Sequence, residues 1–191
     1  MRINRAIASI SALVLLLSGC ASTSTSSSVA SAPVTTCDFP TGSTPNQLPN
    51  LKMPCLTSTG YTTEQFSLHS LKGPLVINLW GSWCPPCREE MPLFRDLYLA
   101  TEKTKALSIV GVDVEESSPK DALNFMSEQG MVWPQFADNT QVTRADFGMG
   151  VPVTWFVNAK GEVTYRQVGQ IHSWAQMQGL IQMHLGITVS S

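Results

Sequence analysis

Two cysteines separated by two prolines, Cys84 and Cys87, are the residues whose types and spacing most clearly suggest chemistry. A pair at this spacing can bind a metal, close a loop, or alternate between a dithiol and a disulfide. A nearly continuous apolar run at 75–80 precedes the pair, which predicts a strand buried on both faces. The residues that follow repeat apolar side chains at helical spacing. The pair is therefore predicted to lie at the junction of a buried strand and a helix.

This junction favours redox chemistry over the other two roles. At a helix N-terminus, unpaired backbone N–H groups and the helix dipole stabilise anions. A thiolate is an anion, so the pKa of Cys84 is expected to fall and its sulfur to become a nucleophile near neutral pH. Cys87 lies one helical turn further on and is expected to be shielded. We therefore predict an exposed attacking Cys84 and a buried resolving Cys87, which form a redox-active disulfide.

Further elements along the chain indicate a mixed α/β architecture. Apolar runs, turn residues and helical stripes predict strands at 107–112, 153–157 and 162–168 and helices at 118–130 and 174–185. The strand at 162–168 alternates only partly and is expected near an edge of the sheet. Strands that alternate with helices predict a sheet with helices on both faces. The adjacent acids Glu115 and Glu116 are interpreted as a solvated loop.

The segment NLWGSWCPPCREEMP at 78–92 resembles the thioredoxin superfamily, most closely its membrane-anchored oxidoreductases of the TlpA/ResA type. A second segment, FGMGVPVTWFVNAKGEV at 147–163, resembles the cis-proline loop, strand and hairpin of that superfamily. The resemblance covers roughly 50–186. It implies a thioredoxin-like α/β fold, in which a mixed central sheet is flanked by helices and carries an N-terminal extension and a helix-containing insertion near 113–140.

The resemblance also implies roles for individual residues. It implies that the Val151–Pro152 bond is cis, that Pro152 packs against the cysteine pair as a catalytic residue, and that Val151 and Trp83 contact the substrate. The alternative for Pro152 is a trans proline that begins a strand. Extended backbone at Val151 can pair with a bound peptide.

Glu90 is a candidate proton relay. Thioredoxin carries a buried aspartate six residues before its first cysteine, and this chain has Asn78 there, which cannot accept a proton from Cys87. Glu90, three residues after Cys87, matches the glutamate that the ResA type places beside its active site, and it is expected to accept and return that proton. The alternative is a solvated glutamate in the first helical turn.

The N-terminal residues are typical of a bacterial lipoprotein. A positive start, an apolar stretch and the sequence LSGC predict a signal peptide at 1–19 and lipidation of Cys20. An ordinary signal peptide is the alternative. The polar residues that follow predict a lipid-anchored flexible linker at 20–36, and the thioredoxin-like domain is expected at 37–191.

Lipidation of Cys20 leaves four cysteines, and the pairing of Cys84 with Cys87 leaves Cys37 and Cys55. The segment between the latter two is rich in proline and has little periodicity, so a structural disulfide is predicted there. A zinc site built from all four cysteines is the alternative, but their spacing matches no familiar zinc-binding pattern. No metal and no cofactor are expected.

The resemblance implies an extracytoplasmic thiol–disulfide oxidoreductase at the outer face of the bacterial cytoplasmic membrane. A membrane-embedded thiol donor is expected to supply its electrons, and exported proteins, including apocytochrome c during cytochrome c maturation, to receive them. Alternatives are an oxidase on the same fold and a copper-binding assembly protein of the Sco type, although that type has three residues between its cysteines. A net charge of −2 argues against a nucleic-acid partner.

The two prolines predict that the pair donates electrons. Pro85 and Pro86 have no backbone N–H group, so Cys87 is the main local donor left to a Cys84 thiolate. Strong oxidants stabilise their reduced form through a very acidic thiol. An ionised Glu90 nearby would raise the cysteine pKa values by repulsion between like charges. We therefore expect a potential nearer that of thioredoxin, about −270 mV, than that of the oxidant DsbA, about −120 mV.

Overall fold

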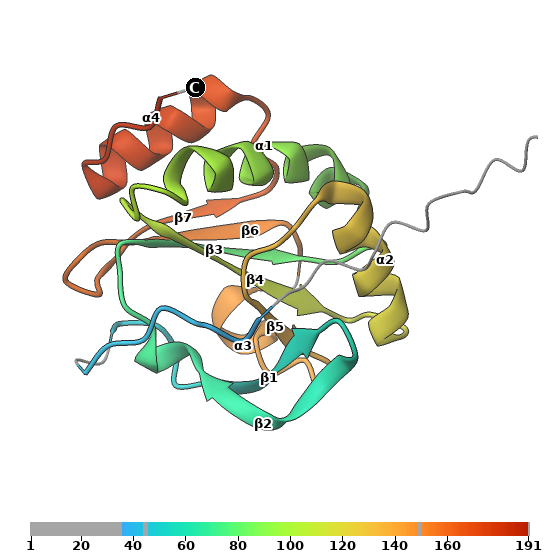
Figure 1. The fold of residues 1–191 in the computed structure, drawn as a ribbon. Coiled ribbons are helices and arrows are strands. Elements are labelled where there is room, and N and C mark those ends of the chain that lie inside the picture. Colours follow the sequence, from blue (N-terminus) through green and yellow to red (C-terminus); the bar gives the residue numbers. More distant parts are fainter. Residues whose placement is uncertain (1–35, 44–45, 149, 191) are drawn as a thin grey trace, which may run out of the picture.

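One sheet of seven strands forms the centre of the molecule (Figure 1). The computed structural model describes residues 36–43, 46–148 and 150–190. The strands lie in the order β2-β1-β5-β4-β3-β6-β7. β3 pairs in parallel with β4, and β4 with β5, whereas the remaining neighbours are antiparallel. The strands are β1 Lys52–Thr57, β2 Gly60–Ser67, β3 Leu75–Trp80, β4 Ser108–Val114, β5 Gln135–Asp138, β6 Val153–Val157 and β7 Val163–Val168. The helices are η1 Leu68–Ser70 (3-10), α1 Pro85–Thr101, α2 Pro119–Gln129, α3 Arg144–Phe147 and α4 Trp174–Leu185.

β3 lies inside the sheet between β4 and β6, and all six of its residues are buried. Val76 and Trp80 face one core, and Ile77 and Leu79 face the other. A strand that is covered on both faces has no solvent side for polar residues, which explains its continuous apolar run. At its end, the chain turns into α1, so the strand and helix predicted around the cysteine pair are confirmed.

The two faces of the sheet are covered differently. Apolar residues of α1, α2 and α4, such as Phe94, Phe125 and Met177, form the core on one face. Figure 1 shows α1 and α4 over this face. On the opposite face, Phe147 of α3 packs with residues of the N-terminal extension, including Phe39 and Leu48. The N-terminal extension therefore covers much of this face of the sheet, in place of a second layer of helices.

The expected helix-containing insertion is present between β4 and β6. Its main helix, α2, begins with Pro119 after Ser118 as the N-cap residue. It ends at Gly130, whose φ of 68° is a left-handed conformation that glycine adopts without strain. The strands predicted at 153–157 and 162–168 and the final helix are confirmed, and β7 lies at an edge of the sheet.

The β1–β2 hairpin, β5 and α3 were not expected from the sequence. The predicted signal peptide, Cys20 and nearly all of the predicted linker lie outside the described residues. Within the described ranges, no helix combines the length and apolar character needed to cross a membrane.

Candidate active site

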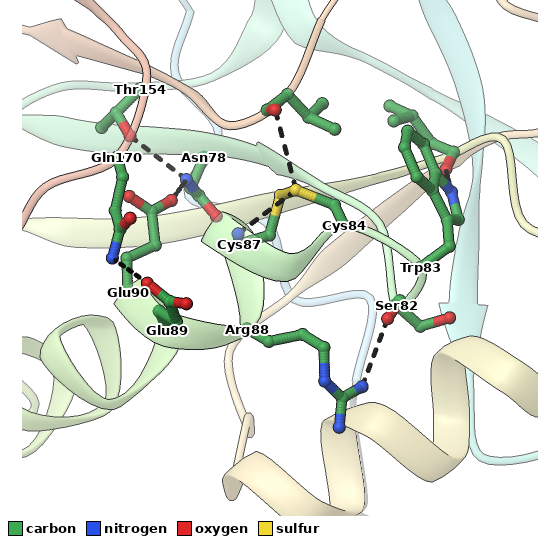
Figure 2. The surroundings of a disulfide bond; sticks show 12 residues. Asn78, Ser82, Trp83, Cys84, Cys87, Arg88, Glu89, Glu90, Thr154 and Gln170 are labelled. Carbon is green, nitrogen blue, oxygen red and sulfur yellow. Dashed lines mark hydrogen bonds between the residues drawn. A yellow bond between two sulfur atoms is a disulfide. The ribbon is translucent and has the colours of Figure 1, made fainter.

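Cys84 and Cys87 form a disulfide at the start of α1, with an S–S distance of 2.02 Å (Figure 2). Cys84 is the N-cap residue of the helix, and its sulfur accepts a hydrogen bond from the backbone N–H of Cys87 at 3.2 Å. Pro85 and Pro86 lie between them at the first helical positions, where a missing N–H costs the helix nothing. This geometry leaves one local backbone donor directed at the attacking sulfur.

The expectation that Cys84 is exposed is wrong for the disulfide state. Cys84 is 2% exposed and Cys87 is 0% exposed. Cys84 Sγ lies 3.6 Å from the carbonyl oxygen of Val151, on a loop that is 67 positions later in the chain. A disulfide sulfur carries no proton, so this is a packing contact that a Cys84 thiol would convert into a hydrogen bond. In the disulfide state, Cys84 therefore offers a substrate very little exposed surface.

The loop before β6 lies against the disulfide. The Val151–Pro152 peptide bond is cis, and Pro152 is buried. Trp83, by contrast, is 52% exposed, and its indole N–H donates to the Val114 carbonyl at 3.2 Å. Trp83 and Val151 border a shallow hollow, which places the two predicted substrate-contacting residues on one surface. The hollow is lined by Leu79, Trp83, Val114, Glu115, Thr143, Arg144, Gly148, Gly150 and Val151.

Glu90 is completely buried one helical turn after Cys87. One carboxylate oxygen accepts a hydrogen bond from the Asn78 side chain, and the other accepts one from the backbone N–H of Ile171, each at 2.9 Å. The Asn78 amide also donates to the Thr154 hydroxyl at 3.1 Å. Figure 2 shows Asn78 and Glu90 on one side of the disulfide and Trp83 on the other. Two separate segments, β3 and the loop after β7, thus hold the Glu90 carboxylate in place, and Thr154 of β6 in turn holds Asn78.

Burial raises the pKa of Glu90 from 4.5 to about 7, although the hydrogen bonds from Ile171 and Asn78 oppose the shift. An isolated buried carboxylate is costly, so the proton is retained to higher pH. A group with a pKa near 7 can accept and return a proton at neutral pH with little driving force lost in either direction. The neighbouring Glu89, by contrast, is exposed to solvent. Its carboxylate accepts a hydrogen bond from the Gln170 side chain at 3.1 Å.

The interpretation of Glu115 and Glu116 as a solvated loop is wrong. Glu115 forms an ion pair with Arg144 at 2.8 Å. Glu116 accepts hydrogen bonds from the backbone N–H and, at 2.7 Å, from the hydroxyl of Ser82. Sequence reasoning missed these contacts because the partners lie about 30 positions apart, and an acidic pair after a strand gives no local signal of them.

Cys37 and Cys55 are also joined by a disulfide, across 18 positions. Cys55 is fully buried in β1, where it pairs with Phe136 of β5. The bond therefore links the N-terminal extension to the sheet. Within the described ranges, no group of three or more His, Cys, Asp or Glu side chains is arranged to hold a metal ion.

Replacement of both Cys37 and Cys55 by alanine is expected to lower the free energy of unfolding by about 3 kcal/mol, because a loop of this length is then free in the unfolded chain. Urea denaturation of the oxidised protein measures the change. The Cys84→Ala/Cys87→Ala variant, which opens a much shorter loop, is the control and should lose less. Equal denaturation midpoints for the Cys37/Cys55 variant and the unaltered protein would rule out a stabilising disulfide.

The model of the AhpC/TSA family matches residues 45–166, which is more than half of the 191-residue chain. The chain belongs to the AhpC/TSA family. Thiol-disulfide oxidoreductase ResA of Bacillus thuringiensis (strain Al Hakam) is 29% identical to it over 131 residues, which cover 68% of this chain and 74% of the relative. Thiol:disulfide interchange protein DsbE of Tatumella citrea is 30% identical over 128 residues, which cover 66% and 65%.

A solved structure has the same fold. A secreted Mycobacterium tuberculosis disulfide oxidoreductase, homologous to E. coli DsbE, superposes with a TM-score of 0.58 at 22% identity, covering 70% of this chain and 96% of that chain. The fold is thioredoxin-like, as the sequence resemblance implies. With relatives of the ResA and DsbE type, this AhpC/TSA-family chain is a thiol–disulfide oxidoreductase.

Proposed function

We propose that the protein reduces disulfides in exported proteins through a dithiol–disulfide cycle at Cys84 and Cys87. The observation that carries this proposal is the poor supply of local donors to Cys84: the Cys87 N–H lies 3.2 Å from its sulfur, and the two residues between are prolines. A weakly stabilised thiolate disfavours the dithiol state relative to the disulfide. Such a pair gives up its electrons readily.

The first step is attack on the substrate. The Cys84 thiolate attacks one sulfur of the substrate disulfide, so that the substrate S–S bond breaks and a mixed disulfide forms. The displaced substrate sulfur leaves as a thiolate and takes a proton from water. Trp83 and Val151 border the hollow beside Cys84 and are the proposed contacts for the substrate backbone and side chains near the reacting sulfur.

The second step is resolution by Cys87. The Cys87 thiol transfers its proton to the Glu90 carboxylate, and the resulting thiolate attacks Cys84 Sγ. The mixed disulfide breaks, the second substrate thiolate leaves, and the Cys84–Cys87 disulfide forms, so that two electrons have passed to the substrate. Pro152 is the proposed catalytic neighbour that closes the site over the sulfurs without offering them an N–H donor. A membrane-embedded thiol donor would restore the dithiol.

The protein is proposed to act at the outer face of the cytoplasmic membrane, held there by lipid on Cys20 and separated from it by the linker at 20–36. The lipoprotein-type sequence before Cys20 supports this location, and the two disulfides suit an oxidising compartment. The Cys20→Ala variant is expected to leave the membrane fraction or to remain unprocessed, as judged by cell fractionation and mass. Normal processing and membrane retention of that variant would contradict lipidation at Cys20.

Apocytochrome c is the proposed substrate class, through the family resemblance. The test uses a peptide that contains two cysteines separated by two residues and followed by histidine, oxidised to its disulfide. The reduced protein is expected to reduce this peptide until the peptide dithiol predominates. Net flow in the other direction, from reduced peptide to oxidised protein, would favour the oxidase alternative.

A further inference from the structure

The turn between β3 and α1 is held by a carboxylate from a distant segment. Glu116, two residues after the end of β4, binds Ser82, which is two residues before Cys84. One carboxylate oxygen accepts from the Ser82 backbone N–H, and the other accepts from the Ser82 hydroxyl at 2.7 Å. Both oxygens of one side chain are therefore directed at a single residue of the turn.

The rest of Ser82 and its neighbours are also tightly constrained. The Ser82 carbonyl accepts from Arg88 at 3.2 Å, and the Cys84 N–H donates to the Gly81 carbonyl at 3.1 Å. A Cβ atom at Gly81 would lie 2.6 Å from the indole nitrogen of Trp83, so the Trp83 ring folds closely back over the turn. A shift of the turn would consequently move Trp83 and Cys84 together.

Asp113 of β4 interacts with Glu116. Its side chain is 2% exposed, and its Oδ1 has no hydrogen-bond partner among the described residues. Burial, followed by the charge of Glu116 and a hydrogen bond with it, raises the pKa of Asp113 well above its ordinary value. A protonated Asp113 can donate a hydrogen bond to the Glu116 carboxylate and so support the side chain that binds Ser82. Hydrogen bonds to a charged group are stronger than those between neutral groups.

We propose that Glu116 is a positioning residue for thiol–disulfide exchange: its carboxylate holds the Ser82 turn so that Cys84 stays against the Val151 carbonyl and Trp83 stays beside the substrate hollow. A displacement of about 1 Å in a reacting group can cost as much as a hundredfold in rate. This role concerns exchange in either direction, so it rests on the oxidoreductase activity and not on the proposed reducing direction.

The test measures the second-order rate constant for exchange between the full chain, in detergent, and a cysteine-containing peptide disulfide. The Glu116→Gln variant is expected to react about tenfold more slowly, the loss expected for one charged hydrogen bond. The Ser82→Ala variant, which loses only the hydroxyl contact, should react about threefold more slowly. The double variant should be no slower than Glu116→Gln alone, because both changes act through one contact. The Glu64→Gln variant removes an equal charge from exposed β2 and should react at the unaltered rate.

A second readout separates positioning from stability. The Cys84 thiolate absorbance, followed against pH, is expected to give a lower pKa in Glu116→Gln, because a nearby negative charge has been removed. A role in stability alone would lower the unfolding temperature and leave the rate and the thiolate pKa of the folded variant unchanged, which would overturn the proposal. Rate losses that multiply in the double variant would also overturn it. If the Glu116→Gln variant fails to fold, an unaltered exchange rate in the Ser82→Ala variant would overturn the proposal.

Discussion

Replacement of Cys84 by serine is expected to abolish disulfide exchange, with a loss of about four orders of magnitude or more. Cys84 is the N-cap residue of α1, and its sulfur faces both the Cys87 N–H and the cis-proline loop. A serine hydroxyl is not ionised near neutral pH and does not form a disulfide. The rate of peptide-disulfide reduction measures the loss, and an unfolding temperature equal to that of the unaltered protein with Cys84 and Cys87 reduced serves as the control for folding.

The Cys87→Ser variant should behave differently from Cys84→Ser. Its Cys84 can still attack, but no buried sulfur remains to resolve the product, so a mixed disulfide with the substrate should accumulate. Mass spectrometry under non-reducing conditions identifies the covalent product. If Cys84→Ser trapped the substrate and Cys87→Ser did not, the two cysteines would have exchanged roles.

Replacement of Glu90 by glutamine is expected to slow the resolving step by about a hundredfold, within the range of general acid–base catalysis. With a pKa of about 7, Glu90 ionises as the pH rises through 7, and only the ionised form accepts the Cys87 proton. The rate of the unaltered protein should therefore rise through this range, and the variant should lack that rise. Decay of a preformed mixed disulfide, followed from pH 5 to 9, measures both effects.

The same substitution alters the pH dependence of stability. The pKa of Glu90 is about 7 in the folded protein against an ordinary value of 4.5, so the folded state holds this proton more tightly than the unfolded state. The stabilisation due to the protonated form is fully present below about pH 4.5 and is lost as the pH rises to 7, a change of about 3 kcal/mol. Glu90→Gln should remove this part of the slope. Glu89→Gln, at the exposed neighbour, is the control for both rate and stability; equal effects in the two variants would contradict the proton relay.

Most elements that position the site were predictable from local patterns. The run at 75–80 identifies β3 because a strand buried on both faces is apolar throughout. Ser118, Pro119 and Gly130 identify the ends of α2 because helix termini have specific capping needs. The β1–β2 hairpin was harder to predict. β1 contains Pro54 in its interior, and much of β2 is polar, so neither shows the apolar run or clear alternation that identifies the other strands.

The contacts within the site depend on residues far apart in the chain, and local patterns carry no information about them. The burial of Cys84 comes partly from Val151, and the position of Glu90 depends on Ile171, 81 residues later. From the sequence, the position of Glu90 three residues after Cys87 predicted only that its side chain lies near the cysteine pair. Whether it was solvated or buried was decided by Asn78 and the loop after β7. The link from Glu116 to Ser82 had no sequence signal at all.

The reduction potential of the Cys84–Cys87 couple tests the reducing direction most directly. The protein is equilibrated with glutathione buffers of known potential at pH 7, and the fractions of dithiol and disulfide are read by alkylation and mass spectrometry. A single local donor to Cys84 and the buried acid Glu90 predict a potential near that of thioredoxin, about −270 mV. A potential above roughly −180 mV, where isomerases and oxidants lie, would contradict the account and identify the protein as an oxidant.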